Sequence, residues 1–347
     1  MTDNILSLIY TFSGEFSDPK TNLTFEPKNN NVSAIVKNGN VNVFLQVSGE
    51  QTSEYKEILL SLKNKIQQIP NVLSVNIALT SEKNDNKTEQ KFTIDAKNII
   101  AIASGKGGVG KSTFSVNLAV ALKSLGLKVG LLDADIYGPS VPRMMGISKK
   151  PEMNENKKLI PLQNYGVKCM SIGFIIDDEA PTIWRGPMVM KALEQMFNGV
   201  EWGYLDYLII DLPPGTGDAQ LTLAQKSKLS GSIIVSTPQE VALTDARKGI
   251  NMFKKVNVDI LGIIENMSYF ICDNCNEKHF IFSKDGPRKD AEKFKIPFLG
   301  NIPINKRLRK KSDEGIPCCI DEPNGEMSKI FISIAKNINQ SSITKHS

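Results

Sequence analysis

The sequence predicts an α/β fold in which helices cover both faces of a mostly parallel sheet, preceded by a small α+β domain. Two patterns support this prediction. After residue 98, short runs of β-branched residues alternate with amphipathic helical stretches, which is typical of a parallel sheet. Before residue 80, two alternating strands, a helix and a further strand follow one another instead. A chain of 347 residues is also long enough for two domains.

Residues 1–80 are predicted to form the small α+β domain. A turn at 38–40 separates two stretches in which apolar and polar residues alternate, which indicates a hairpin. The helix that follows is apolar on one face and stops before Pro70, because proline cannot continue a helix. The expected elements are strands at 32–36 and 41–45, a helix at 53–69 and a strand at 72–79.

A linker is predicted at residues 81–97, because the polar run at 80–91 has no apolar face. Residues 98–347 are then expected to form the larger domain. Its strands are almost continuously apolar, which implies that both faces of the sheet are buried. The expected strands are 99–103, 128–132, 167–172, 207–210, 232–236 and 260–264, with helices between them such as 113–125 and 188–197.

Composition narrows the class of protein. Apolar residues make up 41% and charged residues 23% of the chain, which is an ordinary globular mixture. No apolar run approaches the ~20 residues of a membrane helix, and the start of the chain lacks the basic flank of a secretory signal. We therefore expect a cytoplasmic protein without a membrane partner. The five cysteines do not suit a disulfide framework, so metal binding or redox chemistry is expected of any special cysteine.

Positive charge is concentrated in residues 278–311, which hold eleven Lys and Arg against three Asp and Glu. Such a stretch could meet nucleic acid, an anionic membrane or an acidic partner. We favour a solvated rim, because the charges are interleaved with apolar residues at helical spacing and no aromatic stacking set accompanies them. Nucleic acid is therefore disfavoured as a partner.

A phosphate-binding loop is predicted at residues 105–112, which read GKGGVGKS directly after one predicted strand and before a helix. The glycines let successive backbone N–H groups turn inward around phosphate oxygens, and the helix N-terminus adds its positive dipole end. Lys111 is expected to reach the β- and γ-phosphates of ATP. Ser112 is expected to offer an oxygen to Mg²⁺. The larger domain is thus predicted to be a P-loop NTPase.

Carboxylates follow two other predicted strands at their C-terminal ends, where open α/β sheets bind ligands. Asp211 ends one strand and is expected to hold Mg²⁺ through water, while the Pro-Gly-rich turn that contains Gly215 could sense the γ-phosphate. Asp133 and Asp135 follow the other strand and stand two residues apart, so their side chains lie on the same side of an extended chain. This placement suits the surroundings of the metal ion and an attacking water.

Several segments carry a resemblance to known families. Residues 106–113, KGGVGKST, resemble the deviant Walker A motif of the MinD/ParA/nitrogenase iron protein class. Residues 133–140 (DADIYGPS), 211–218 (DLPPGTGD) and 265–268 (ENMS) are similar to the Mrp/ApbC (Nbp/Ind-like) iron-sulfur cluster carriers, and the match runs from about 98 to 317. The resemblance implies a homodimer in which Lys106 touches the partner's phosphates.

The resemblance also implies roles for single residues. Asn266 would contact the adenine, Thr113 the α-phosphate and Asp135 the attacking water. Together, motif and resemblance assign catalytic roles to Lys106, Lys111 and Asp135. They assign nucleotide binding to Gly105, Lys106, Gly107, Gly108, Val109, Gly110, Lys111, Ser112, Thr113, Asp133, Asp211, Gly215 and Asn266, and Mg²⁺ binding to Ser112 and Asp211.

A cysteine pair, Cys272 and Cys275, stands where the carrier family places its Cys-x-x-Cys. One pair supplies only two of the four ligands that an iron-sulfur cluster or a structural zinc ion needs, whereas a symmetric dimer supplies four. The resemblance thus implies a 4Fe-4S cluster that bridges two subunits. Zinc remains an alternative, because Cys272, Cys275 and His279 make a plausible three-ligand set. The other cysteines, Cys169, Cys318 and Cys319, are expected to be small core residues.

The expected function is that of an ATP-hydrolysing carrier that receives a labile 4Fe-4S cluster and transfers it to apoproteins, with a cluster assembly scaffold as a further partner. The alternatives are a ParA/MinD-like positioning ATPase that acts on DNA or membrane, a zinc-stabilised dimeric ATPase, and a reductase similar to the nitrogenase iron protein. The small domain weakly resembles an iron-sulfur assembly domain but contains no cysteine. Relatives often read IFGxGG after the cysteine pair, where this chain has IFSKDG at 281–286.

Overall fold

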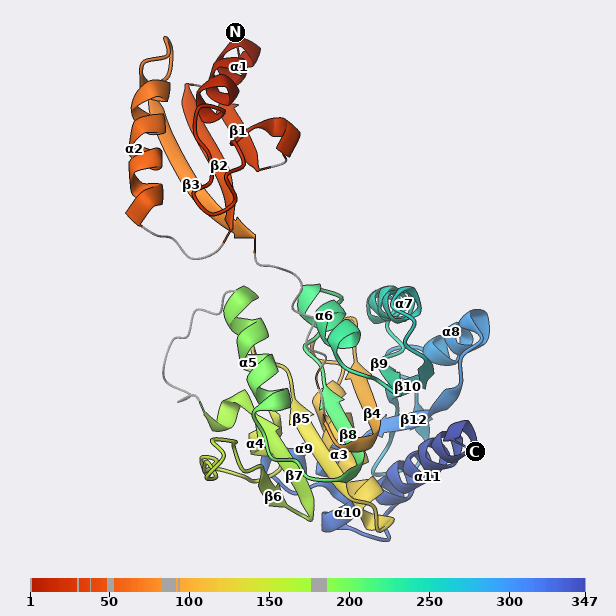
Figure 1. Cartoon of the computed structure of the whole chain (residues 1–347). Coiled ribbons are helices and arrows are strands. Elements are labelled where there is room, and N and C mark those ends of the chain that lie inside the picture. Colours follow the sequence, from red (N-terminus) through yellow and green to blue (C-terminus); the bar gives the residue numbers. More distant parts are fainter. Residues whose placement is uncertain are drawn as a thin grey trace. The chain divides into compact units, whose positions relative to one another are not determined.

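The computed structural model of the chain divides into two units, Met1–Gln90 and Lys91–Ser347 (Figure 1). It describes residues 2–29, 31–37, 39–48, 53–82, 92, 94–175 and 186–346. Most of the predicted linker lies outside the described residues. Phe92 belongs to the second unit, where its ring stacks on that of Phe197 with centroids 4.4 Å apart.

In its described part, the first unit is a three-stranded sheet with two α-helices. Strand β1 (Val32–Lys37) runs antiparallel to β2 (Asn40–Ser48), and β3 (Ser74–Glu82) runs parallel to β2. The parallel crossover is made by α2 (Ser53–Gln67), and a short 3-10 helix, η1 (Pro27–Asn29), precedes β1. The hairpin, the helix and the third strand were each predicted from the sequence.

Helix α1 (Thr2–Ser13) was not predicted. Ile5 and Ile9 lie on its buried face and join one core with residues of the sheet and of α2. The spacing of these two apolar residues by one helical turn is the signal that could have identified the helix.

The second unit is built on a sheet of nine strands in its described part, in the order β11-β10-β9-β4-β8-β5-β7-β6, with β12 beside β10. The strands are β4 (Ala96–Ala103), β5 (Val129–Asp133), β6 (Leu162–Asn164), β7 (Val167–Ser171), β8 (Leu205–Asp211), β9 (Gly231–Ser236), β10 (Ile260–Ile271), β11 (Lys278–His279) and β12 (Phe298–Ile304). The helices are α3 (Lys111–Ser124), α4 (Val141–Met144), η2 (Ile172–Phe174), α5 (Gly186–Asn198), α6 (Asp218–Lys226), α7 (Glu240–Lys255), α8 (Gly286–Phe294), α9 (Lys306–Asp313), α10 (Cys318–Asp321) and α11 (Glu326–His346).

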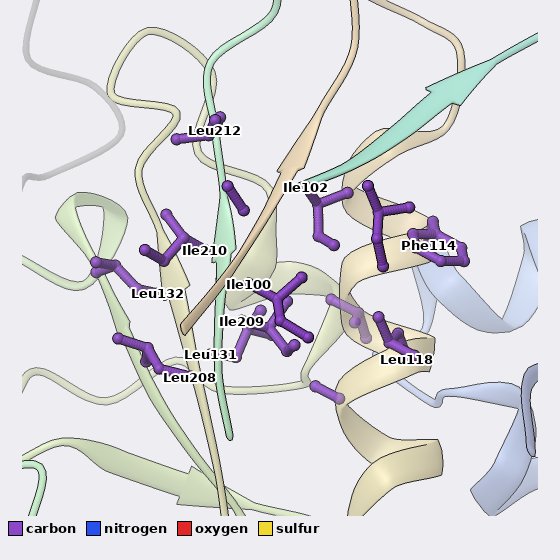
Figure 2. Packing of buried hydrophobic residues seen from close by; sticks show 14 of the residues in the cluster. Ile100, Ile102, Phe114, Leu118, Leu131, Leu132, Leu208, Ile209, Ile210 and Leu212 are labelled. Carbon is purple, nitrogen blue, oxygen red and sulfur yellow. The ribbon is translucent and has the colours of Figure 1, made fainter. Parts of the chain in front are cut away.

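The sheet is parallel except for β6 and β11, which pair antiparallel at its margins. Side chains alternate across the central strands, and Figure 2 shows Ile100 and Ile209 directed toward Phe114 and Leu118 of α3, with Ile210 on the other face. Strands β4, β5, β8 and β9 are buried on both faces over almost their whole length, which confirms the predicted α/β sheet.

The sheet differs from the sequence prediction in its outer strands. Strand β10 continues seven residues past the predicted end at Ile264, to Ile271, and strands β6, β11 and β12 were not predicted. Strands β10 and β12 pair in parallel, and β12 thereby supports the extension of β10. The extension carries the chain directly to Cys272. None of the described helices is both long and apolar enough to span a bilayer.

Candidate functional site

The predicted phosphate loop leaves β4 and enters α3, as its motif requires. Gly108 and Gly110 have φ angles of +79° and +84°, a left-handed conformation that favours glycine. Two glycines are also required by close packing. A Cβ atom at Gly105 would lie 2.2 Å from the backbone of Asp245 on α7, and one at Gly110 would lie 2.2 Å from Nδ2 of Asn266. The loop is therefore shaped by β10 and α7 as well as by the phosphates it could hold.

Lys111 lies at the centre of three buried carboxylates. Its Nζ atom is 2.9 Å from Oδ1 of Asp211 and 3.8 Å from Oδ2 of Asp135, and the lysine is only 6% exposed. Ser112 donates a hydrogen bond from Oγ to Oδ2 of Asp211 at 2.6 Å. The strand ends of β4, β5 and β8 thus bring together the residues that the sequence motifs singled out separately.

Asp133 is held in place beneath this cluster. Its carboxylate accepts hydrogen bonds from the backbone N–H of Val141 at 3.2 Å and from Oγ of Ser171 at 3.0 Å. Burial, with a further contribution from the charge of Asp211, raises the pKa of Asp133 to about 7. Burial also raises the pKa of Asp135. One lysine therefore faces three carboxylates in a buried site, and a divalent cation would balance the excess negative charge.

The oxygen atoms present suit Mg²⁺, because hard cations prefer carboxylate and hydroxyl ligands. Ser112 and Asp211 already meet through a hydrogen bond at the mouth of the phosphate loop. A second hydroxyl, Oγ of Ser115, donates to Oδ1 of Asp211 at 2.7 Å. Ser115 and Ser171 were not predicted from the sequence. The signal for Ser115 was its position one helical turn after Lys111, and the signal for Ser171 was its position at the end of a predicted strand.

The turn after β8 is attached to the phosphate loop. Gly215, with φ of +100°, donates its backbone N–H to the carbonyl of Ser104 at 2.9 Å. A cavity of about 750 Å³ opens beside it, between Asp135 and Tyr137 on one side and Pro213, Gly217 and residues of α5 and α6 on the others. A displacement of this turn would therefore reach both the phosphate loop and the cavity.

Lys106 is exposed, and its carbonyl accepts a hydrogen bond from Oγ of Ser104 at 3.0 Å. Thr113 is half-buried, with its hydroxyl 4.0 Å from Sδ of Met144. Neither side chain joins the carboxylate cluster. Their predicted contacts with phosphates therefore stay predictions.

Asn266 connects the phosphate loop to strand β10. It is 8% exposed, and its Nδ2 atom donates to the carbonyl of Val109 at 2.7 Å. Met267, the next residue, has φ of +53°, and the pairing of β10 with β12 shifts register between Asn266 and Phe270. The residue that was predicted to contact adenine thus also fastens the loop to the strand that ends at the cysteine pair.

Glu265, which precedes Asn266, is a buried acid that the sequence analysis did not select. It is 1% exposed, and among the described residues its Oε2 atom has no hydrogen-bond partner. Burial, with a contribution from the charge of Asp285, raises the pKa of Glu265 to about 7, although the backbone N–H and the charge of Arg288 act in the opposite direction. The carboxyl group therefore lies against the first turn of α8.

Glu265→Gln is expected to reduce the pH dependence of folding. The unfolded carboxyl ionises near 4.5 and the folded one near 7, so the folded state binds more protons between these values and the parent loses stability as pH rises through them. The variant should keep its stability over this range, because glutamine does not ionise. The difference in free energy of unfolding, variant minus parent, should grow by roughly 1–3 kcal/mol from pH 5 to pH 8. Urea titrations at both pH values test this, and a constant difference would contradict it.

Cys272 and Cys275 lie in a short hairpin at the end of β10. The backbone N–H of Cys272 donates to the carbonyl of Glu277 at 3.0 Å, and that of Asn276 donates to the carbonyl of Cys272 at 2.9 Å. Asn276 has φ of +58°, which closes the turn. Strand β11 then returns antiparallel to β10, with His279 opposite Phe270. The two thiol sulfurs and a ring nitrogen of His279 all lie within 4.8 Å of one another.

The pKa of the Cys272 thiol lies below its ordinary value. Backbone N–H groups of Asn274 and Cys275 lower its pKa, because they donate hydrogen bonds that stabilise the charged form. Lys306 forms an ion pair with Asp273, which ties the hairpin to the start of α9. The other three cysteines are buried, as predicted.

The loop that follows the hairpin contains the departure from the IFGxGG pattern. Asp285 has φ of +60°, in the left-handed region that glycine adopts without strain. Gly286 begins α8, where a Cβ atom would lie 2.8 Å from a methyl group of Leu243. The loop thus keeps a glycine-like backbone at Asp285 with a non-glycine residue.

Part of the basic stretch is neutralised by acids from outside residues 278–311. Its densest part is α9, where the cations lie along one short helix and pair with neighbouring carboxylates. The pairs are Lys306 with Asp273, Arg307 with Asp321 and Glu322, Arg309 with Asp313, Lys310 with Glu314, and Lys311 with Glu314 and Asp321. Exposed pairs contribute little stability, but they reduce the positive charge that α9 presents.

The fold and the nucleotide site define a P-loop NTPase of α/β architecture. A phosphate loop joins a central parallel strand to a helix, and its lysine meets carboxylates from two neighbouring strand ends. The chain belongs to the NUBPL iron-transfer P-loop NTPase family, whose model matches residues 95–339. The predicted resemblance to iron-sulfur carriers is thereby confirmed.

Individual relatives agree with this assignment. A protein from Arabidopsis thaliana, named iron-sulfur protein required for NADH dehydrogenase, mitochondrial, is 57% identical over 243 residues, which cover 70% of this chain and 78% of that protein. An iron-sulfur cluster carrier protein from Aquifex aeolicus is 51% identical, with coverage of 70% and 68%. The solved nucleotide-binding protein from Archaeoglobus fulgidus, in complex with ADP, is 41% identical with a TM-score of 0.59, covering 68% of this chain and 93% of that one.

Proposed function

We propose that this protein is an ATP-hydrolysing carrier that holds a labile 4Fe-4S cluster between two subunits and transfers it to apoproteins. The observation that carries the proposal is the course of β10, which runs from Asn266 at the phosphate loop to Cys272 at the cysteine hairpin. The names of the relatives support iron-sulfur transfer as the purpose of this arrangement. The cytoplasmic location and the delivery of the cluster from an assembly scaffold stay predictions.

The nucleotide site supports ATP hydrolysis. Lys111 would neutralise charge on the β- and γ-phosphates, and the backbone N–H groups of 107–112 would surround the phosphate oxygens. Ser112 and Asp211 would hold Mg²⁺, which neutralises phosphate charge when bound. Asp135 borders the cavity beside the Gly215 turn, so it can orient an attacking water there.

The cluster requires two chains. Each hairpin supplies two thiolates, whereas a 4Fe-4S cluster takes about four cysteine ligands. Apolar surface next to the cysteines favours a second copy of this chain as the partner: Phe280, Ile281 and Phe282 are 41%, 58% and 39% exposed. Contact between two such surfaces would remove apolar area from water and bring the four thiols together.

A homodimer also gives Lys106 a role. Its exposure to solvent leaves the ammonium group accessible to the phosphates of a partner subunit. Lys106→Ala should therefore retain ATP binding within about threefold of the parent while hydrolysis falls by at least ~10²-fold, because the lost contact acts on the transition state. Fluorescent-nucleotide titration and phosphate release measure the two quantities. Equal losses in both would contradict the contact in trans.

The positioning ATPase is the weaker alternative. Its only support was the basic stretch, and the cations of α9 are paired with carboxylates.

The test of the carrier proposal is anaerobic reconstitution with iron and sulfide, followed by absorption spectroscopy, metal analysis and sizing. We expect a brown dimer with about four irons and four sulfides per two chains. Colourless, metal-free protein after this treatment would refute the proposal.

A further inference from the structure

The cysteine hairpin places a third metal-ligating side chain beside the two thiols. In the β10–β11 pairing, His279 stands opposite Phe270, two residues before Cys272. This register brings a ring nitrogen of His279 within 4.8 Å of both sulfurs. The three ligand atoms thus come from eight consecutive residues of a single chain.

The hairpin is held in this form by contacts outside the three ligands. The Cys272 backbone is bonded to Glu277 and Asn276 across the turn, and Lys278 lies with Nζ 4.7 Å from the centroid of the Tyr269 ring. The ion pair between Lys306 and Asp273 fixes the hairpin to α9. Little rearrangement is therefore needed to gather the ligands around one ion, since tetrahedral Zn–S and Zn–N bonds of about 2.0–2.3 Å separate neighbouring ligand atoms by less than 4 Å.

We propose that Cys272, Cys275 and His279 form an intrachain site for one thiophilic divalent cation, such as Zn²⁺, in each subunit. Two thiolates and one imidazole are ligands that such ions prefer, and they leave the fourth tetrahedral position open to water or to a side chain of an acceptor. Cys275 and His279 are exposed, so the ion can enter from solvent. The site shares its cysteines with the proposed cluster but needs neither a second chain nor sulfide.

A chain cannot hold the single divalent ion and the bridging cluster at the same time. A single ion occupies both thiolates of one chain, whereas a bridging cluster takes the same thiolates from two chains. Zinc-loaded protein should therefore accept less cluster on reconstitution than metal-free protein. The imidazole should matter only for the single ion, because four thiolates already complete the cluster.

The test is anaerobic titration of reduced, metal-free full-length protein with Co²⁺, which reports its ligands through thiolate-to-cobalt charge transfer and visible bands. The parent should bind one Co²⁺ per chain as a monomer with the intense visible absorption of a tetrahedral site. His279→Ala should change the visible bands and weaken the affinity for Co²⁺. The loss should exceed ~10–100-fold, which is the usual cost of removing a residue that only hydrogen-bonds to a metal ligand. His346→Ala, the other histidine of the chain, is the matched control and should behave as the parent.

Two results would overturn the inference: parent-like affinity and spectrum in His279→Ala, or binding of one Co²⁺ per two chains. A second measurement does not depend on the variant. Proton NMR of the two histidine rings during Zn²⁺ titration should shift the resonances of His279 and leave those of His346 in place, and the reverse pattern would equally overturn the inference. The cluster proposal is tested separately, because iron-sulfur reconstitution should succeed in His279→Ala even where Co²⁺ binding fails.

Discussion

Lys111→Ala is expected to lower the turnover number for Mg²⁺-dependent ATP hydrolysis by at least ~10²–10³-fold, which is the usual cost of removing one group that stabilises charge in a transition state. Lys111 is the only cation that meets the carboxylate cluster among the described residues, with contacts to Asp211 and Asp135. In the variant, the loop would no longer offset, from within its own subunit, the negative charge that grows on the phosphates. Phosphate release under saturating ATP measures the loss.

The loss must be separated from simple unfolding, because Lys111→Ala also leaves Asp211 buried without its ion-pair partner. Circular dichroism melts of the two proteins should show a variant that still folds cooperatively. Lys123→Ala, a change in the last turn of the same helix, should hydrolyse ATP at the parent rate. A folded Lys111→Ala protein with parent activity would show that the phosphate loop is not the catalytic site.

Cys272→Ala and Cys275→Ala are each expected to abolish the cluster. Loss of one thiolate per chain leaves two ligands in a symmetric dimer, which is half of the usual set. Reconstituted variants should be colourless, hold less than about one iron per dimer and lose the cluster-dependent dimer on sizing columns. ATP binding should persist, because the cysteines follow the end of β10 while the nucleotide loop meets it at Asn266.

Cys319→Ala is the matched control, since this cysteine is 7% exposed on α10 and packs in the core. It should keep the colour and the iron content of the parent. A metal-free parent that stays colourless on iron-sulfur reconstitution but dimerises when it binds zinc would point instead to the zinc-stabilised ATPase. A parent that needs no metal but binds DNA or anionic vesicles in a salt-sensitive way would point to the positioning ATPase.

The nucleotide half of the candidate site could be predicted from sequence because the α/β topology determines where the ends of the strands lie. The carboxyl ends of parallel strands meet at one edge, so a loop at 105–112 and acids after β5 and β8 had to converge. The sequence could not show why Gly105 and Gly110 are glycines in this chain. Their Cβ positions are blocked by Asp245 and Asn266, which come from other elements 140 and 156 residues further along.

The cysteine hairpin of the candidate site was less predictable. The spacing of Cys272, Cys275 and His279 predicted a plausible three-ligand set. That the three lie together depends on the register of β11 with the extension of β10, which the hydrophobic pattern of the sequence did not predict. The ion pairs of α9 could not be predicted for a similar reason. Its positive residues were counted along the chain, whereas their partners Asp273, Asp321 and Glu322 are brought beside them by the fold.

The hydrogen bond between Asn266 and Val109 has a thermodynamic consequence. If ATP changes the affinity of the hairpin for its cargo through this contact, the cargo must change the affinity for ATP by the same factor, because the coupling free energy belongs to both equilibria. Typical couplings of about 1–3 kcal/mol correspond to roughly 5–150-fold in each direction. A loaded carrier would then differ from an empty one in the ATP concentration it needs, and the nucleotide level of its surroundings would set the fraction of carriers that retain their load.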